Sequence, residues 1–478
     1  ERLRFQCCHP KNCCADMTLS SFQASGDQRL RVAIVGSGIS GLAAAHRLSD
    51  EVDVTLFEAG DYFGGHTHTV DVSLPGADGP VTHGVDTGFL VFNERTYPNL
   101  IRLFKELGVA TAKSDMSFSV KVPAAERSRA MEWSGSSLNS VFAQRGNLLN
   151  WRFWRMLRDI LRFNRRTSAL AKSGAEAEML QPLSEFLLQE NYSEEFRDWY
   201  FLPMMGCIWS CPTDQMLQFP VATMIRFCHN HGLIQVSDRP QWWTVTGGAR
   251  HYVDKIIAGI QDKRLATPVL AIERHAGGVR ITSGTGAASR TEDFDKVVLA
   301  THSDQALALL SQPSPAEKAV LGAIAYQPNR AVLHTAAAVL PVRPLAWAAW
   351  NYERAADTRR ESTQVCLHYL LNMLQPLPFQ QPVVVSLNPV TPIAAEHVLD
   401  SFDYAHPVFD GAAIRAQKEL PALQGQQHTY FCGAWTGYGF HEDGLKSGLL
   451  VAELIADLGQ PAFVAPPPLK ANAEWLNT

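Results

Sequence analysis

The hydrophobic pattern near the beginning of the chain predicts a strand, a tight turn, a helix and a second strand. Residues 31–35 form a short apolar run rich in β-branched side chains, and Gly36 follows it. Small and apolar residues at positions 41–48 predict a helix, and positions 52–57 predict another strand. Because these elements follow one another within about 30 residues, they form a βαβ unit and imply a parallel sheet.

Further elements follow from the same kind of pattern. Apolar residues between positions 97 and 107 recur at helical spacing, and Gly108 stands where a C-terminal cap belongs, so a helix is expected there. The rest of the pattern predicts strands at residues 269–272, 279–281, 296–300 and 429–432, a helix at about residues 444–458, and a flexible tail from Pro466 onward.

Residues 145–172 differ from the rest, because arginines alternate there with aromatic and aliphatic residues. At 100° per residue the arginines occupy one arc of roughly 140°, and apolar side chains fill the remainder. This basic amphipathic helix has two interpretations. It lies at an anionic membrane interface, or it buries its apolar face in a protein core and presents arginines to water and local acids. The arginines are Arg152, Arg155, Arg158, Arg162, Arg165 and Arg166.

The length and net charge of the chain limit the classes of protein to which it can belong. The chain has 478 residues, 46% of them hydrophobic, which is more than one hydrophobic core commonly holds, so two domains are expected. Its 42 basic and 47 acidic residues give a net charge of −5, which does not favour nucleic acid as a partner. Without a spanning apolar run or a signal peptide, the sequence predicts a cytoplasmic protein, with a peripheral membrane contact if residues 145–172 lie at an interface.

The nine cysteines do not predict a metal site or a disulfide framework. Cys7, Cys8, Cys13 and Cys14 precede the first strand, but their spacing is not that of paired metal ligands. Since the chain opens with Glu1 and a start at Met17 is compatible with the sequence, residues 1–16 are interpreted as a fragment or a translated leader and do not guide the fold assignment.

A glycine motif connects the first strand to the first helix and indicates a dinucleotide site. The motif consists of Gly36, Ser37, Gly38, Ile39, Ser40 and Gly41. Its first glycine permits the tight turn, its second lets the backbone approach a pyrophosphate, and its third allows close packing of helix and strand. Glu58 ends the second strand, where its carboxylate can bind an adenosine ribose and disfavours a 2′-phosphate.

A second glycine pair, Gly64 and Gly65, follows Glu58 closely. Here the chain resembles the flavin-containing amine oxidase superfamily, whose second phosphate-contacting motif places two glycines after the ribose acid. The resemblance implies FAD as cofactor. The superfamily usually has arginine where this chain has His66, so the charge at that contact stays open, because histidine need not be cationic at pH 7.

The segment 431–448 resembles the closing flavin motif of the same superfamily, in which a glycine-bearing strand meets a helix N-terminus. The pair Gly247 and Gly248 and the strand at Val269 match two further motifs. Besides the residues of the first glycine motif and Glu58, the resemblance implies FAD contacts at Ala59, Gly64, Gly65, His66, Thr67, Gly88, Val269, Gly433, Glu442, Asp443, Gly444 and Leu445.

A closer resemblance covers nearly all of residues 30–460. The segments 64–69, 85–89, 93–98, 114–118, 208–212, 326–330 and 433–443 are similar to bacterial NAD/FAD-binding oxidoreductases associated with cyclopropane-fatty-acid synthases, and to the oxidase-like half of plant cyclopropane synthases. This resemblance implies a fatty acyl or other lipid chain as substrate, and a cyclopropane-fatty-acid synthase-like methyltransferase as functional partner.

Catalytic candidates follow from position beside the expected flavin. His441, Tyr438 and Glu442 are the first choices for moving a proton or holding the flavin ring, since the cofactor itself carries the hydride chemistry. Asp443, His68 and Asp86 are further candidates. Trp209, Trp347, Trp350 and Tyr352, together with Tyr438, are expected either to line an apolar cavity or to belong to the core.

The sequence thus predicts an α/β protein with a Rossmann-like, glutathione-reductase-type FAD domain and an inserted α+β substrate domain. The FAD domain is expected from residues 30–116, 236–312 and 416–460, and the substrate domain from residues 117–235 and 313–415. Residues 1–29 are expected to be a leader or a disordered segment, and residues 461–478 a tail. The expected activity is oxidation or desaturation of a lipid chain by hydride transfer to FAD. The alternatives are amine or polyene oxidation, as in phytoene desaturases, and an accessory role beside a lipid methyltransferase.

Overall fold

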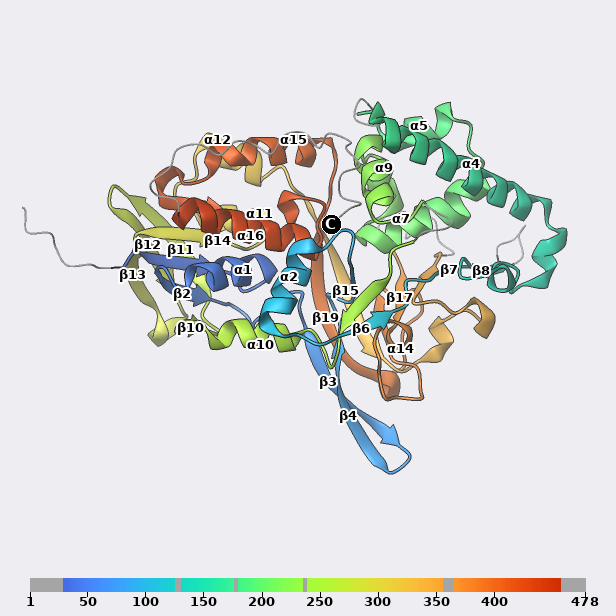
Figure 1. The fold of residues 1–478 in the computed structure, drawn as a ribbon, viewed down its shortest axis with the longest axis horizontal. Coiled ribbons are helices and arrows are strands. Elements are labelled where there is room, and N and C mark those ends of the chain that lie inside the picture. Colours follow the sequence, from blue (N-terminus) through green and yellow to red (C-terminus); the bar gives the residue numbers. More distant parts are fainter. Residues whose placement is uncertain (1–28, 125–129, 176–178, 235–238, 356–363, 457–478) are drawn as a thin grey trace, which may run out of the picture.

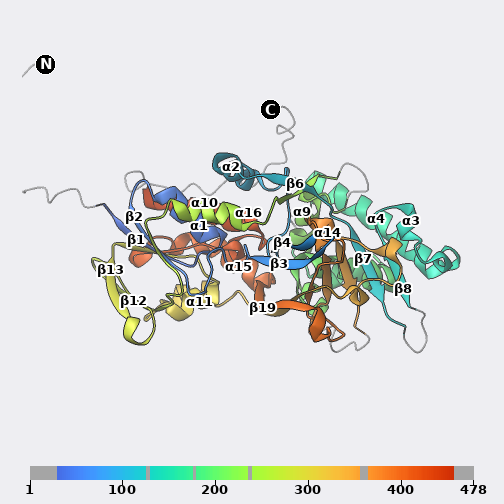
Figure 2. The same ribbon diagram turned by 90° about the horizontal axis from the view of Figure 1, so that it is seen from below.

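The computed structural model of the protein describes residues 29–124, 130–175, 179–234, 239–355 and 364–456. Two parts lie at opposite ends of Figure 1, one built on a five-stranded sheet and the other on a seven-stranded sheet. The view at a right angle in Figure 2 shows the same division. The fold is therefore the mixed α/β, two-part architecture that the sequence predicts.

The five-stranded sheet contains the predicted βαβ unit and is parallel throughout. In it β1 (Arg31–Val35) lies at the centre, between β2 (Asp53–Phe57) and β14 (Lys296–Leu299). The edges are β10 (Asp262–Arg264) and β20 (Thr429–Phe431). Because strands from three distant stretches of sequence pair here, the FAD domain is discontinuous along the chain.

Alternate residues of β1 face two different cores. Val32 and Ile34 pack on the side of the helices α1 (Ile39–Leu48) and α16 (His441–Ala456). Ala33 and Val35 face a second core, as the period of two in a strand requires. This core also contains residues of the antiparallel sheet β11 (Val269–His275), β12 (Gly278–Ser283) and β13 (Arg290–Phe294), and of the helices α11 (Ser303–Leu309), α12 (Pro315–Leu321) and α15 (Gly411–Glu419). The segments α12 and 411–415, which the sequence assigned to the substrate domain, thus pack with the FAD domain.

The seven-stranded sheet forms the substrate domain, and its neighbouring strands are antiparallel except for β16 and β7. In spatial order its strands are β19 (Val398–Pro407), β15 (Tyr326–His334), β18 (Val384–Leu387), β17 (Leu367–Leu370), β16 (Trp350–Glu353), β7 (Phe118–Val122) and β8 (Met131–Ser134). Its helices are α3 (Leu138–Val141), α4 (Trp151–Ser173), α5 (Leu183–Gln189), α6 (Glu194–Phe196), α7 (Leu202–Trp209), α8 (Thr213–Met216), α9 (Val221–Asn230) and α14 (Leu371–Leu374).

Smaller elements connect the two parts. They are the hairpin of β3 (Thr69–Gly76) and β4 (Gly79–Asp86), the short sheet of β5 (Phe92–Asn93), β9 (Trp242–Val245) and β6 (Thr111–Ser114), and the helices α2 (Pro98–Leu107) and α10 (Arg250–Ala258). Gly108 ends α2 in the left-handed conformation, with φ of 61°, which confirms the predicted cap. The hairpin projects from the molecule in Figure 1 and was not expected from the sequence.

The basic amphipathic segment forms α4, but its apolar stripe is buried. Phe153, Met156 and Phe163 lie in the core of the substrate domain. At the border of this stripe, Arg152 and Arg155 pair with the carboxylate of Glu195. A helix whose apolar stripe is occupied by protein cannot also insert that stripe into lipid, so the buried stripe of α4 follows the core interpretation, and a membrane contact of the exposed first turn stays a prediction. No helix in the described ranges has both the length and the apolarity needed to cross a membrane.

Candidate active site

The first glycine motif forms a cradle at the N-terminus of α1. Gly36 has φ of +100°, which favours glycine, and a Cβ on Gly41 would lie 1.9 Å from the Gly36 carbonyl oxygen. Gly38 caps α1 without any side-chain hydrogen bond, and no atom lies within 4 Å of where its Cβ would be. Free backbone N–H groups beside open space form a site for an anion such as a pyrophosphate.

Glu58 lies beside this cradle at the end of β2. Its carboxylate accepts hydrogen bonds from the backbone N–H of Ser37 (3.0 Å) and of Gly60 (2.8 Å), and from the Ser37 hydroxyl. These bonds fix the carboxylate at the wall of the cavity described below. The position is the one that ribose recognition requires.

The second glycine pair packs directly on the first motif. Gly64 and Gly65 have φ of +127° and +58°, and a Cβ on Gly65 would lie 3.1 Å from the Cα of Gly38. The N–H of Gly64 donates to the Ser37 hydroxyl at 3.1 Å. Position 88 also requires glycine, because a Cβ there would lie 2.3 Å from the carbonyl oxygen of His66. The two phosphate motifs are therefore one continuous backbone surface.

His66 lines the cavity where the superfamily usually has arginine. Its Nε2 is buried and has no hydrogen-bond partner among the described residues. Burial, reinforced by the nearby His406, His302 and His441, holds the pKa of His66 well below its usual range, so the ring is neutral. Its ring stacks on Tyr404 with the centroids 4.9 Å apart. In the protein without a bound dinucleotide, the His66 side chain therefore offers a hydrogen bond but no positive charge.

Three residues of this wall were missed by sequence reasoning: His302, Tyr404 and His406. The ring centroids of His66 and His406 lie 5.5 Å apart, and those of His66 and His302 lie 6.3 Å apart. His302 comes just after β14 and His406 belongs to β19, so only the folded chain brings them to the second glycine pair. No local motif identifies them.

The closing motif contributes to the cavity through its first half. The lining residues from this segment are Gly433, Ala434, Trp435, Tyr438, Gly439, Phe440 and His441. Gly433 has φ of +158°, and its N–H donates to the Ser447 hydroxyl at 2.9 Å. The predicted FAD contacts at Asp443, Gly444 and Leu445 do not line the cavity in the described structure. Asp443 accepts a hydrogen bond from the N–H of Phe440 and so caps α16.

Glu442, predicted as both a catalytic residue and an FAD contact, is directed away from the cavity. Its carboxylate accepts hydrogen bonds from the backbone N–H groups of Asn99 and Leu100, each at 3.0 Å, and from the Asn99 side chain at 2.6 Å. These donors belong to the first turn of α2, where N–H groups have no partner within the helix. Glu442 therefore joins α16 to α2, and the catalytic assignment is corrected for this reason.

His441 and Tyr438 do line the cavity. The Tyr252 hydroxyl lies 2.6 Å from His441 Nε2 and also 2.6 Å from the Thr67 hydroxyl. The His441 ring stacks on Phe89 with the centroids 3.8 Å apart. Burial lowers the pKa of His441 to about 3, so the ring is neutral and rigidly positioned. A neutral imidazole held in this way can form a hydrogen bond to a ligand but does not carry charge at pH 7.

Asp86, another predicted candidate, has a structural role. Asp86 accepts hydrogen bonds from the N–H of Ala249 and from the Thr69 hydroxyl, so it ties β4 to the turn containing Gly247 and Gly248. Burial raises the pKa of Asp86 to about 7.

Some of the remaining candidates line the cavity and others do not. Those that line it in the described structure are Trp209, Trp350 and Val269. Those that do not are Asp86, His68, Trp347 and Tyr352.

A cavity of about 690 Å³ connects the two parts of the molecule. One end is the glycine cradle with Glu58 and His66. The other end, which we call the apolar chamber, is lined by Met116, Cys207, Ile208, Trp209, Phe227, Leu233, Trp242, Trp350, Tyr369 and Leu387. Among the described residues around the whole cavity, Glu58 is the only carboxylate, and no lysine or arginine is present. The chamber therefore offers shape and apolar contact rather than charge.

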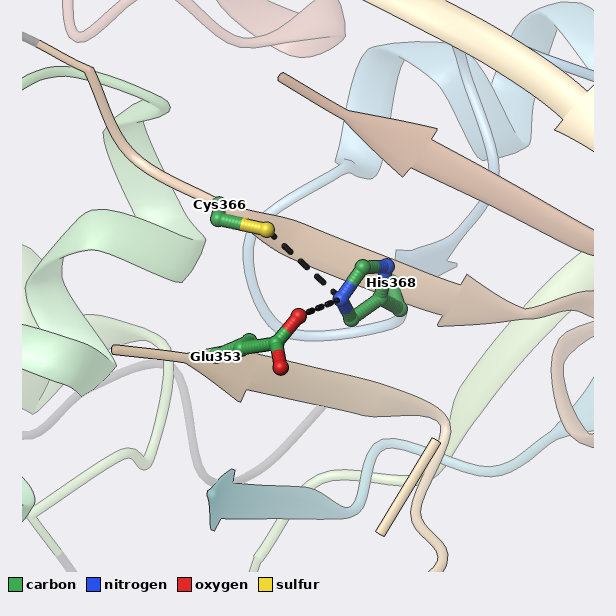
Figure 3. A group of neighbouring side chains, drawn as sticks. All are labelled: Glu353, Cys366 and His368. Carbon is green, nitrogen blue, oxygen red and sulfur yellow. Dashed lines mark hydrogen bonds and ion pairs between the residues drawn. The ribbon is translucent and has the colours of Figure 1, made fainter. Parts of the chain in front are cut away.

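A second buried cluster, shown in Figure 3, lies apart from the cavity. The Nε2 of His368 is 3.1 Å from a Glu353 oxygen and 3.6 Å from the Cys366 sulfur. Lys121 pairs with the other Glu353 oxygen at 2.9 Å, and Ser386 bonds to the other nitrogen of His368. These ligand types can hold a metal ion, but Lys121 already neutralises the carboxylate, and every ligand atom has a partner within the protein. The cluster is accordingly a polar network that joins neighbouring strands.

The residues present fit FAD. The glycine cradle leaves room for a pyrophosphate, Glu58 stands where a ribose is bound, and the unpartnered Nε2 of His66 faces the same cavity. Together with the Rossmann-like sheet, these features define a flavoprotein oxidoreductase with a separate substrate domain. Sequence comparison gives the family: the chain belongs to the flavin containing amine oxidoreductases, whose family model matches residues 39–339. It is an FAD-dependent oxidoreductase.

Solved structures of similar fold are numerous. Cyclohexylamine oxidase from Brevibacterium oxydans IH-35A is 17% identical, with a TM-score of 0.62 over 90% of this chain and 99% of that one. Putrescine oxidase bound to putrescine is 15% identical, with a TM-score of 0.61 and the same coverage. A fatty acid isomerase from P. acnes that produces CLA is 16% identical, with a TM-score of 0.59 and again the same coverage. No curated protein sequence matches the chain. At these identities the likeness shows the fold alone.

Proposed function

We propose that this flavoenzyme oxidises or desaturates a neutral lipid chain, such as a fatty acyl group, by transfer of a hydride to FAD. The observation that carries the proposal is the apolar chamber, which continues from the FAD cradle without a charged side chain among the described residues. A cationic substrate would lose its hydration there without gaining a carboxylate partner, and that costs several kcal/mol per ion. A hydrocarbon chain gains about 0.8 kcal/mol for each CH₂ that it buries.

The residues of the chain have distinct roles in this proposal. FAD, when bound, supplies the hydride acceptor. Glu58 and the backbone of Gly36 and Gly38 hold the dinucleotide, and His66 offers a neutral hydrogen bond to it. Aromatic and aliphatic side chains of the chamber exclude water and align the substrate carbon. His441, fixed by Tyr252 and Phe89, positions the ligand near the closing motif.

The structural neighbours support both lipid and amine chemistry in this fold. The P. acnes protein is a fatty acid isomerase, and two of the other neighbours are amine oxidases. Amine oxidation is therefore the alternative activity, favoured by the several aromatic rings around the chamber. A partnership with a cyclopropane-fatty-acid synthase-like methyltransferase belongs to the same proposal, since such an enzyme would act on the same class of acyl chain.

An anaerobic absorbance spectrum of the purified protein tests the proposal. Phospholipids or free fatty acids with monounsaturated, cyclopropane or methyl-branched chains are added, and bleaching of the flavin band by one of them is expected. Cyclohexylamine and putrescine serve as matched amine probes. Bleaching by an amine and by no lipid would replace the proposed substrate. A flavin that no compound reduces, in a protein that nevertheless stimulates a purified acyl-chain methyltransferase, would indicate the accessory role instead.

A further inference from the structure

An exposed apolar surface lies at the end of the substrate domain, around α3 and the first turn of α4. Leu149 is 94% exposed, Leu138 is 81% exposed and Trp151 is 67% exposed. Single exposed hydrophobic residues are common on proteins, but a contiguous group of large ones marks an interaction site. We call this group the apolar tip, and its members are Leu138, Leu148, Leu149, Trp151, Trp154, Val342 and Leu345.

Two segments distant in sequence form the apolar tip. The short helix containing Leu345, η6 (Pro344–Ala346), contacts α3 and β8. The N–H of Val342 donates to Glu132 at 2.7 Å, and the N–H of Glu132 donates to the Gln144 side chain at 3.0 Å. The indole N–H of Trp154 donates to the carbonyl of Leu148 at 2.9 Å. The tip is thus a defined surface, and Figure 2 shows α3 and α4 at the end of the molecule opposite β1 and β2.

The segment that forms most of the apolar tip carries charge of one sign. From residue 133 to residue 158 the sequence has no aspartate or glutamate, but it has Arg145, Arg152, Arg155 and Arg158. The acid that pairs with Arg152 and Arg155 is Glu195, whose side chain is only 1% exposed, whereas the two arginine side chains are 44% and 36% exposed. The outer face therefore presents guanidinium groups, because the neutralising carboxylate lies beneath them.

We propose that the apolar tip docks on the surface of an anionic lipid bilayer. In this arrangement Leu149 and Trp151 enter the boundary between headgroups and acyl chains, and the arginines lie at the level of the lipid phosphates. Tryptophan and arginine are the residues that favour this interface. Arg155 lies over the ring of Trp151 with its Cζ 4.9 Å from the ring centroid, so aromatic and cationic groups form one surface.

A second copy of the chain is the competing occupant, and the charges disfavour it. A two-fold interface brings the same patch of both copies together. The arginines around the tip would then face the same arginines of the other copy, whereas an anionic bilayer offers them phosphates. The docking surface consists of α3, η6 and the exposed residues at the beginning of α4, and the buried apolar stripe of α4 stays in the core. The inference does not depend on which substrate the cavity accepts.

Vesicle sedimentation with the FAD-bound, full-length protein tests the proposal. Vesicles of equal parts phosphatidylglycerol and phosphatidylcholine are compared with vesicles of phosphatidylcholine alone, at low and at high salt. Binding to the anionic vesicles is expected to be at least about tenfold tighter and to weaken with salt, because the arginines contribute through screened electrostatics. The double variant Leu149→Ser, Trp151→Ser should lose at least about tenfold in binding while its flavin spectrum stays unchanged.

A matched control is Leu270→Ser, because Leu270 is 50% exposed but lies on β11 in the FAD domain, far from the apolar tip. This variant should bind vesicles as the unaltered protein does. Absence of binding to anionic vesicles would overturn the proposal, and so would undiminished binding of the double variant. A concentration-dependent dimer that the double variant abolishes, in a protein that does not sediment with vesicles, would assign the tip to a second copy.

Discussion

The glycine cradle and the apolar chamber are the two ends of one cavity, but they are built in different ways. The cradle is made of backbone, and its shape depends on positions such as Gly36 and Gly41, where a side chain would collide with main chain. The chamber is made of side chains that come mainly from α7, α9, β9, β16, β17 and β18. Cofactor binding is therefore expected to depend on a few positions that tolerate no change, whereas substrate preference is expected to depend on many positions that can vary.

The largest effect is expected from Gly41→Val, which tests whether the cradle tolerates a side chain. A Cβ at this position would lie 1.9 Å from the carbonyl oxygen of Gly36, so β1 and α1 would have to separate. We expect a protein without bound flavin and with a loss of stability of at least about 3 kcal/mol, measured by flavin absorbance and denaturant unfolding. Gly146→Ala is the control, since a Cβ there meets no atom within 4 Å. A Gly41→Val protein that binds flavin and keeps its stability would contradict the inference that the glycine cradle holds the cofactor.

A smaller effect is expected from Gly38→Ala, which separates cofactor binding from folding. Gly38 has φ of −62°, and there is open space where a Cβ would lie. The free energy of unfolding of the flavin-free protein should therefore stay within about 1 kcal/mol of its original value. The added methyl group occupies space beside the free N–H groups of α1, and we expect FAD affinity to fall at least about tenfold. Fluorescence titration with FAD measures this. Unchanged affinity would mean that the pyrophosphate does not approach Gly38.

The chamber is tested by Ile208→Asp, with Ile208→Val as the matched control. Ile208 lines the chamber at the end of α7 and is only partly buried, so an acid there can ionise without unfolding the domain. We expect flavin content to be kept, reduction of the flavin by lipid chains to slow at least about tenfold, and reduction by amines to improve. Stopped-flow absorbance under anaerobic conditions measures the rates. If flavin reduction by lipid chains and by amines slowed equally, the substitution would have distorted the chamber as a whole.

The smallest effect is a dependence of stability on pH that the buried histidines of the cavity impart. Burial lowers the pKa of His406 to about 4 and that of His441 to about 3. Below the ordinary histidine pKa near 6.5 the unfolded chain takes up protons that the folded protein does not, so stability falls as the pH decreases from 6.5 toward 4. Asp86, whose pKa burial raises to about 7, acts in the opposite sense.

The pH effect is measured as the melting temperature of the flavin-free protein between pH 7 and pH 4. His406→Gln should flatten the decline, because it removes one of the contributing groups, and it should leave the protein folded at neutral pH. Asp86→Asn is the complementary variant, which should make the decline steeper. An identical decline in the unaltered protein and in His406→Gln would show that this histidine is not buried in neutral form.

Much of the cradle could be predicted from the sequence, because its residues are close neighbours along the chain. The strand at 31–35, the glycine turn and Glu58 follow local rules of turn geometry and hydrophobic spacing, and the structure has them at the expected places. The error at Glu442 has a physical cause. An acid in the first turn of α16 fits a cofactor motif, but the free N–H groups of α2 lie within reach in space, and only the folded chain shows that they bind it.

The sequence by itself determined the fold class and the cofactor, and it predicted the glycine cradle and Glu58, because a dinucleotide is bound by backbone that local sequence specifies. The tertiary structure alone decided which side chains meet in the apolar chamber, that His302 and His406 stand beside His66, and that the apolar stripe of α4 is buried while its first turn is exposed. The reason is that such contacts join residues hundreds of positions apart, and hydrophobic spacing tells which residues are buried but not what covers them.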